Sequence, residues 1–169
     1  MSRSRLSLYT WLATTALFVA CVTTSSLSLP ERVATHFDAA GDANGWMSRT
    51  SAIVTVIGLG FGISAFLIGL AYSIRFFPPS TLNVPHQAYW RAPENYPRAC
   101  RYFFLHTFWL AALNNLFLGG VHQSIVAANA DAPPALLIRY ISVGTGLFVT
   151  GVLVWTFFLI RFFLKAPRT

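Results

Sequence analysis

The sequence predicts an all-α membrane protein. It is expected to be one domain, residues 1–169, of four transmembrane helices with both termini in the cytoplasm and an ordered external loop over residues 30–50. Of its 169 residues, 55% are hydrophobic and only 10% are charged, whereas about a quarter of the residues of a soluble domain are charged. Four stretches contain no charged residue, and each is at least as long as the roughly 20 residues that a helix needs to cross a bilayer core. They are Leu6–Pro30, Thr50–Ile74, Tyr102–Ala130 and Tyr140–Ile160.

Within these stretches we expect helical spans at about 8–27, 51–74, 102–126 and 136–160. In lipid the backbone must satisfy its own hydrogen bonds, and long apolar runs without period-two alternation form helices rather than barrel strands. The first run continues past Cys21, so we expect a retained span rather than a cleaved signal peptide. Cys21 and Cys100 lie at opposite ends of different spans and are expected to remain unpaired, because a disulfide needs Cα atoms within about 7 Å.

Basic residues are distributed unevenly between the two sides of the predicted bundle. Nine lie on one side, namely Arg3, Arg5, Arg75, Arg91, Arg98, Arg101, Arg161, Lys165 and Arg168. Only Arg32, Arg49 and Arg139 lie on the other. The positive-inside rule therefore places both termini in the cytoplasm. On this side an Arg followed by two aromatic residues occurs at 75–77, 101–103 and 161–163, a pattern that indicates interfacial anchors.

The loop between the first two spans is rich in turn-forming residues. Asn44-Gly45 is a strong signal for a tight turn, so we expect the chain to reverse there. His36-Phe37 places a polar ring beside an apolar anchor, and Trp46 is expected to return the chain to the membrane interface. The candidate binding residues of this loop are His36, Phe37, Asp38, Gly41, Asn44, Gly45 and Trp46.

The cytoplasmic segment 78–97 carries five prolines. Proline favours extended backbone, and Tyr89-Trp90 suggests that the segment lies along the membrane interface. Pro93-Glu94 is typical of a helix start, with proline in the first turn and an acidic residue near the positive end of the helix dipole. The candidate residues of this loop are Asn83, Pro85, Tyr89, Trp90, Pro93 and Glu94.

The third span is the polar one, and His106, Asn115 and His122 are its candidate intramembrane residues. Asn115 and His122 share a helix face because they are seven residues apart. Interhelical hydrogen bonding is one interpretation, and a functional polar site inside the bundle is the other. The two histidines lie roughly 24 Å apart on one helix, which excludes a haem held between them. No cofactor is expected.

A cation site is a further hypothesis for the external side. His36, Asp38 and His122, with Asp131 nearby in the second external loop, offer two imidazoles and carboxylates, and such groups bind zinc. Their spacing matches no established metal motif, and Asp in exposed loops commonly caps turns. Turn capping and loop-to-helix hydrogen bonding are therefore the favoured interpretation.

Other features exclude function classes. The net charge of +7 comes without a Lys/Arg-rich run, so it indicates topology rather than nucleic-acid binding. No nucleophile motif, phosphate-binding loop or His-Glu-x-x-His is present, and we expect no enzyme. Small residues spaced by four in the second and fourth spans favour close helix packing, within the bundle or with a partner. They are Gly58 and Gly62, Ala65 and Gly69, and Ser142 and Gly146.

Two stretches resemble a family of small bacterial membrane proteins. Leu29-Pro30 through His36-Phe37, Gly41 and Gly45-Trp46 to Ser48-Arg49 resembles the motif of a membrane domain of unknown function. That domain also forms the N-terminal part of the immunity protein against the sporulation-delaying toxin of bacilli. The segment from Asn83 to Glu94 resembles the Asn-x-Pro and Tyr-Trp-x-Ala-Pro-Glu loop of many short members. The resemblance implies a four-span protein, and it implies immunity or signalling as a role only for relatives with further spans.

We therefore expect a non-enzymatic, multi-pass protein of a bacterial cytoplasmic (inner) membrane. It would act as an interaction, signalling, toxin-immunity or accessory subunit, with the lipid bilayer and other membrane proteins or a peptide as partners. An oligomer is compatible with the sequence. The alternative is a small oligomeric transporter or cation-binding protein that uses the polar third span and His36.

Overall fold

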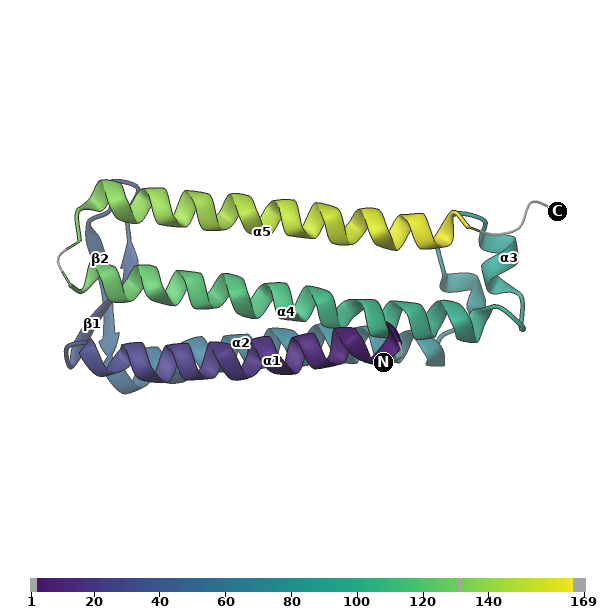
Figure 1. The fold of residues 1–169 in the computed structure, drawn as a ribbon, viewed down its shortest axis with the longest axis horizontal. Coiled ribbons are helices and arrows are strands. Elements are labelled where there is room, and N and C mark those ends of the chain that lie inside the picture. The colour runs from purple at the N-terminus through teal and green to yellow at the C-terminus, as the bar shows by residue number, and fades with distance from the viewer. Residues whose placement is uncertain (1–2, 131, 166–169) are drawn as a thin grey trace.

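The computed structural model describes residues 3–130 and 132–165 and shows a bundle of long helices with a β-hairpin at one end (Figure 1). In chain order the elements are α1 (Arg3–Ser25), η1 (Ser26–Ser28), β1 (Arg32–Phe37), β2 (Ala43–Ser48), α2 (Arg49–Ser73), η2 (Ile74–Phe76), η3 (Pro79–Thr81), α3 (Gln87–Arg91), α4 (Tyr96–Ala128) and α5 (Pro134–Phe163). The N-terminal end of α1 and the C-terminal end of α5 both lie away from the hairpin.

Four helices are long and apolar enough to cross a membrane, which confirms the predicted helical class and makes this a multi-pass membrane protein. All four begin before the expected spans, most clearly α4, which begins at Tyr96 rather than near residue 102. Hydropathy marks only the part of a helix that suits lipid. Arg98 and Arg101 are good helix formers, so the helix continues through them.

Helix α4 is the centre of the bundle, because α1, α2 and α5 all pack against it. Figure 1 shows α5 on one side of α4 and α1 with α2 on the other. Gly151 lets α5 approach Leu113 of α4, since a Cβ at this position would lie 2.7 Å from a Leu113 methyl carbon. Phe117 of α4 stacks on Phe148 of α5 at 4.5 Å between ring centroids. The core therefore surrounds one helix rather than filling a symmetrical four-helix interior.

The hairpin pairs β1 with β2 in antiparallel register, with Val33 opposite Met47 and Phe37 opposite Ala43. The chain therefore reverses over residues 38–42, and the expected turn at Asn44-Gly45 is wrong because both residues belong to β2. Val33 is fully buried with Leu29 and Ala52, against Ile125 and Val126 of α4. This packing fixes the hairpin on the end of the bundle.

The opposite end is closed by a second cluster, built around Trp90 of α3 and Phe163 of α5. The expectation that Tyr89-Trp90 lies along the membrane interface is wrong for Trp90, whose side chain is 1% exposed. Its indole Nε1 donates to the Phe163 carbonyl oxygen at 2.9 Å. The expectation that residues 161–163 form an interfacial anchor is likewise wrong for Phe163, because its side chain is buried.

The helix start expected at Pro93-Glu94 is also wrong. Residues 93–95 form a turn, in which the amides of Asn95 and Tyr96 donate to the Ala92 carbonyl oxygen, each at 2.9 Å. Helix α4 begins at Tyr96 and has Pro97 in its first turn. A proline does lie in the first turn of the helix, but it is Pro97 rather than Pro93.

Candidate functional site at the hairpin end

The hairpin turn is organised by Asp38 and Gly41. The Asp38 carboxylate Oδ1 accepts hydrogen bonds from the amides of Ala40 at 2.9 Å and Asp42 at 3.0 Å. Gly41 has a φ of 89°, in the left-handed region that favours glycine. A Cβ on Gly41 would also lie 2.9 Å from the Cβ of Pro134, so this glycine lets the turn contact the start of α5. Both motif residues are thereby explained by the turn geometry.

His36 and Gly45 face each other across the hairpin. They are partners in the strand register, and a Cβ on Gly45 would lie 2.9 Å from the His36 Cβ. The His36 ring nitrogen Nδ1 is hydrogen-bonded to the side-chain oxygen of Asn44. His36, Asn44 and Gly45 therefore contact one another across the hairpin. Asn44-Gly45 contributes to the pairing of β2 with β1 and does not form the turn.

Asn129, which the sequence analysis did not single out, holds β1 to the end of α4. Its Nδ2 donates to the Ala34 carbonyl oxygen and its Oδ1 accepts from the Ala34 amide, both at 2.9 Å. The side chain thus pairs with β1 as a neighbouring strand would. A lone Asn after an apolar span carries no pattern by which the sequence could have identified this role.

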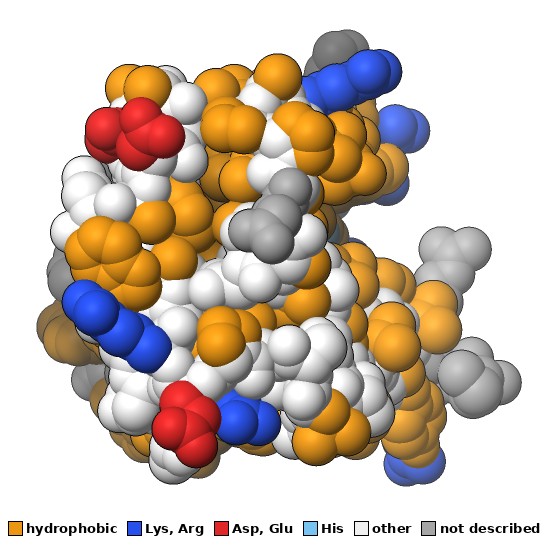
Figure 2. Space-filling model, turned by 90° about the vertical axis from the view of Figure 1, so that its left-hand side faces the viewer, with side chains coloured by type: hydrophobic (Ala, Val, Ile, Leu, Met, Phe, Trp, Pro, Cys, Tyr) orange, Lys and Arg blue, Asp and Glu red, His pale blue; other side chains and the backbone are white. Residues whose placement is uncertain are grey.

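Strand β2 of the hairpin carries exposed apolar side chains. Trp46 and Met47 are 48% and 38% exposed, and the Arg32 guanidinium lies over the Trp46 ring at 5.0 Å. Phe37 is half-buried. Figure 2 views this end and shows charged groups scattered among apolar ones, with the molecule hollowed on one side.

His122 is buried where α4 meets the end of α1. Its Nε2 shares hydrogen bonds with the hydroxyl groups of Ser25 at 3.0 Å and Ser26 at 3.3 Å. The neighbouring Gln123 amide donates to Ser25 Oγ and to Cys21 Sγ, each at 3.0 Å. His122 therefore joins two helices below the hairpin, and its Nε2 faces these serines.

Asn115 connects three helices at membrane depth. Its Nδ2 donates to Thr15 Oγ1 of α1 at 2.8 Å, and its Oδ1 accepts from Ser64 Oγ of α2 at 3.3 Å. Asn115 and His122 both contact α1, as their seven-residue spacing predicts. The adjacent Asn114 differs, because its Nδ2 is buried and has no hydrogen-bond partner among the described residues.

His106 joins α4 to α5 through a reciprocal pair with Trp155. The His106 Nε2 contacts the Trp155 carbonyl oxygen at 3.0 Å, and the Trp155 indole donates to the His106 carbonyl oxygen at 3.0 Å. The two rings stack at 5.1 Å. The three polar residues predicted for this span are thus separate interhelical connections, and the structure does not bring them into one site.

The loop at the other end is held by several hydrogen bonds to backbone oxygens. Asn95 donates to the Tyr89 carbonyl oxygen at 3.1 Å, and the Tyr96 hydroxyl donates to that of Ile74 at 2.7 Å. Asn83, Pro93 and Glu94 are exposed, and Pro85 is half-buried. The predicted motif residues of this loop therefore divide into a buried part around Trp90 and an exposed part.

The proposed cation ligands are not assembled. Among the residues that the structure describes, no group of three or more His, Cys, Asp or Glu side chains is placed to hold a metal ion. His36 and His122 are each committed to the hydrogen bonds given above. Asp131, the further carboxylate considered, lies outside the described residues.

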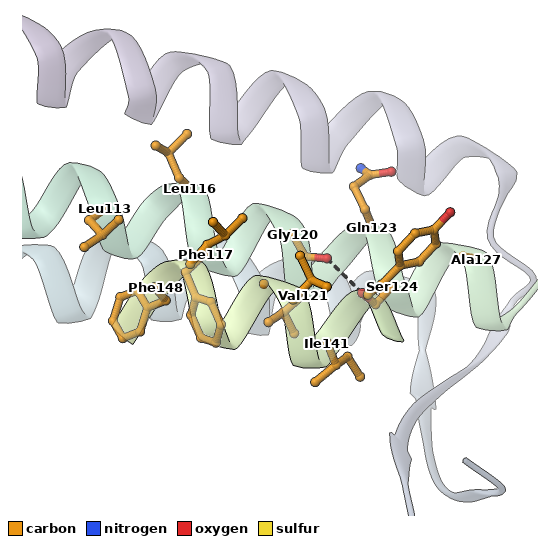
Figure 3. Close-up of a pocket in the computed structure, with 14 residues that line it drawn as sticks. Leu113, Leu116, Phe117, Gly120, Val121, Gln123, Ser124, Ala127, Ile141 and Phe148 are labelled. Carbon is orange, nitrogen blue, oxygen red and sulfur yellow. Dashed lines mark hydrogen bonds between the residues drawn. The ribbon is translucent and has the colours of Figure 1, made fainter. Parts of the chain in front are cut away.

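Two cavities lie beside α4 and α5 near the hairpin. The hairpin cavity, of about 420 Å³, lies between the hairpin turn, α4 and α5, and both His36 and Asp38 line it. The α4–α5 groove, of about 670 Å³, lies between the two helices and is drawn in Figure 3. Residues of the hairpin motif and of the central helix α4 thus line the hairpin cavity together.

Comparison with known proteins identifies one segment. Neither the curated proteins nor the solved structures include a match to this chain. Residues 12–61 match a family model described as "Domain of unknown function (DUF1648)". The matched segment covers most of α1, the hairpin and the first half of α2. The chain therefore carries a segment matching this domain of unknown function within a protein that has four membrane-spanning helices.

Proposed function

We propose that this chain is a non-enzymatic interaction subunit of the bacterial cytoplasmic membrane. In this proposal the hairpin faces the outside and both termini lie in the cytoplasm. The asymmetry of nine basic residues on one side against three on the other supports this orientation. The match of residues 12–61 to a domain of unknown function is compatible with the role and leaves the partner open.

The observation that carries the proposal is that the polar side chains connect the helices to one another, while small and apolar positions face outward. His106, Asn115 and His122 are all committed to interhelical hydrogen bonds. On α2, by contrast, a Cβ added at Gly58 or Gly62 would meet nothing within 4 Å. Outward-facing small residues allow a second transmembrane helix to approach closely.

The hairpin supplies the second part of the interaction surface. Trp46 and Met47 are exposed beside the start of α2, and exposed aromatic residues are frequent anchors in interfaces. A membrane protein that packs against α2 would reach the hairpin at the same end. Toxin immunity, with a membrane-active peptide as the partner, is one form of this role.

Co-purification from the native membrane tests the proposal. A partner retained by the unmodified chain is expected to be lost several-fold in Gly62→Leu and in Trp46→Ala. Gly146→Leu is the matched control, because Gly146 has the same open space around it but lies on α5, away from the proposed surface. A chain that purifies alone, or a partner whose recovery is the same in all variants, would contradict the interaction role.

The transporter or cation-binding alternative receives no comparable support. Its polar residues are engaged in separate pairs along α4, and within the described part of the chain no cluster of metal-ligating side chains is present. The interaction role is therefore the function that the geometry supports best.

A further inference from the structure

A third cavity lies between α1 and α2, in the half of the bundle away from the hairpin. This α1–α2 groove has a volume of about 480 Å³ and is lined by Trp11 of α1, Phe104 of α4 and residues of α2 from Phe61 to Tyr72. Its space depends on two small residues one turn apart on α2, Ala65 and Gly69. A Cβ on Gly69 would meet nothing within 4 Å, so the groove is open along this part of α2.

Aromatic side chains from three helices form one wall of the α1–α2 groove. Trp11 packs against Phe108 with ring centroids 5.5 Å apart, and Phe108 packs against Phe104 at 5.2 Å. Phe104 in turn contacts the Tyr72 ring of α2 edge-on at 5.7 Å. These contacts join α1, α4 and α2, so the wall is fixed by the packing of the bundle itself.

Arg75 lies at the end of the groove, on two of the rings that line it. Its guanidinium carbon is 3.6 Å from the Tyr72 ring centroid and 5.7 Å from the Phe104 ring centroid. Its Nε donates to the Tyr72 carbonyl oxygen at 3.1 Å. The two terminal nitrogens of the guanidinium take no part in this hydrogen bond and remain donors for a ligand. A cation is therefore joined to the apolar groove by direct contact with its lining residues.

The chain supplies little negative charge near Arg75. Glu94 is the one acidic residue of the sequence between Ala43 and Ala130, and its side chain is exposed. Among the described residues, the hydrogen-bond acceptor of Arg75 is a carbonyl oxygen and not a carboxylate. Because a guanidinium binds phosphate through two parallel N–H donors, Arg75 favours an anionic phosphate group at the membrane surface.

The length of the α1–α2 groove matches one leaflet of a bilayer. At 1.5 Å per residue, the lining part of α2 from Phe61 to Tyr72 spans about 16 Å, and half of a bilayer core of about 30 Å is about 15 Å. Arg75 lies at the end of the candidate membrane span Arg49–Phe76. An acyl chain in the groove would therefore run from the level of the head groups to about the centre of the bilayer.

We propose that the α1–α2 groove binds an anionic phospholipid of the bilayer, with the phosphate on Arg75 and one acyl chain along Ala65 and Gly69. A neutral transmembrane helix would cover the apolar part of the groove but would offer no anion to Arg75, so the charge favours the lipid. The site does not include Gly58, Gly62 or Trp46, on which the interaction role rests. The two proposals are therefore tested independently.

Photocrosslinking of the full chain in phosphatidylcholine vesicles tests the site. The probes are phosphatidylglycerol and phosphatidylcholine, each with a diazirine in one acyl chain, and mass spectrometry identifies the labelled residues. Phosphatidylglycerol is expected to label residues 61–72 of α2 several-fold more than phosphatidylcholine does. Equal labelling by the two probes would overturn the proposal. No labelling of the groove by either probe, as when a second copy of the chain covers it, would also overturn it.

Arg75→Gln tests the head group. Without the guanidinium, labelling by phosphatidylglycerol is expected to fall to the level of phosphatidylcholine, whereas Arg75→Lys should keep part of the preference. Arg161→Gln is the matched control, because it removes an exposed positive charge at the same end of the bundle but on α5. A preference for phosphatidylglycerol that survives Arg75→Gln, or that falls equally in Arg161→Gln, would overturn the assignment of Arg75.

Gly69→Leu tests the acyl-chain site, because its side chain fills the groove. It is expected to lower labelling of residues 61–72 by phosphatidylglycerol several-fold in folded protein, and Ala65→Leu should do the same one turn away. Gly58→Leu is the matched control, since Gly58 also has open space around it on α2 but does not line the groove. Its labelling should equal that of the unmodified chain. Labelling that folded Gly69→Leu and Ala65→Leu leave unchanged would overturn the placement of the acyl chain.

Discussion

The side chain of Asn129 pairs with both backbone polar groups of Ala34, with each of the two hydrogen bonds 2.9 Å long. These two hydrogen bonds attach β1, an edge strand of the hairpin, to the C-terminal end of α4. The turn at the far end of the hairpin contacts Pro134 at the start of α5 through Gly41. The hairpin is therefore held by α4 and α5 together, and the geometry of the cavity beneath it depends on both contacts.

Asn129→Ala is expected to destabilise the hairpin by about 1–3 kcal/mol, because it leaves the partly buried amide and carbonyl of Ala34 without their partners. Hydrogen exchange of the Ala34 amide should accelerate, while the amides at the centre of α4 should not change. Asn129→Asp keeps an acceptor and loses the donor, so its effect should be intermediate. Equal exchange in all three proteins would contradict this role.

Two neighbouring asparagines of α4 are expected to respond in opposite directions. Asn115→Leu removes hydrogen bonds to Thr15 and Ser64 and should lower the free energy of unfolding by about 1–3 kcal/mol. Asn114→Leu replaces a buried amide whose Nδ2 has no partner among the described residues, so it should be neutral or stabilising. Unfolding of the detergent-solubilised protein measures both, and a loss of similar size at the two positions would contradict the assignment.

Gly41→Ala and Gly58→Ala separate a required glycine from a replaceable one. At Gly41 the φ of 89° and the close approach to Pro134 both oppose a side chain, so a loss of about 1–3 kcal/mol is expected. Gly58 lies in α2 with open space around it, so alanine should stabilise the helix by up to about 1 kcal/mol. The midpoints of thermal unfolding should shift in opposite directions. If both shift downward, the open space at Gly58 is not present in the protein.

Trp90→Phe tests the cluster that closes the other end. Phenylalanine keeps most of the apolar contact but removes the hydrogen bond from the indole to the Phe163 carbonyl oxygen. A loss of about 1 kcal/mol is expected, whereas Trp90→Ala should cost about 3–5 kcal/mol. Limited proteolysis near the end of α5 should follow the same order. Cleavage in Trp90→Ala that is no faster than in the unmodified chain would contradict the closure of this end by Trp90.

Several features of the fold could be predicted because they depend on length and polarity alone. The four membrane-spanning helices follow from uncharged runs that are too long and too apolar for any other structure in lipid. The ordered hairpin between the first two helices follows from its density of turn-forming residues. The turn itself was placed wrongly, because Asn-Gly is a local signal, whereas the register depends on the packing of Val33 against α4 and on Gly45 opposite His36.

The partners of the polar residues could not be predicted from the sequence. His106, Asn115 and His122 stand out in the third span, but Thr15, Ser25 and Trp155 are unremarkable residues of other helices until the bundle brings them within hydrogen-bond distance. The same is true of Trp90, which resembles an interfacial anchor in the sequence and becomes a buried contact of α5 in the structure.

Apolar length and charge placement alone determined that this chain crosses a membrane four times, because the cost of leaving backbone groups unsatisfied in lipid admits only helices there. Only the tertiary structure decided that α4 is central, that Asn129 holds the hairpin, and that a cavity lined by Asp38 opens between the turn, α4 and α5. Those features depend on contacts between residues far apart in the chain, and side-chain shape determines such contacts in ways that local patterns do not record.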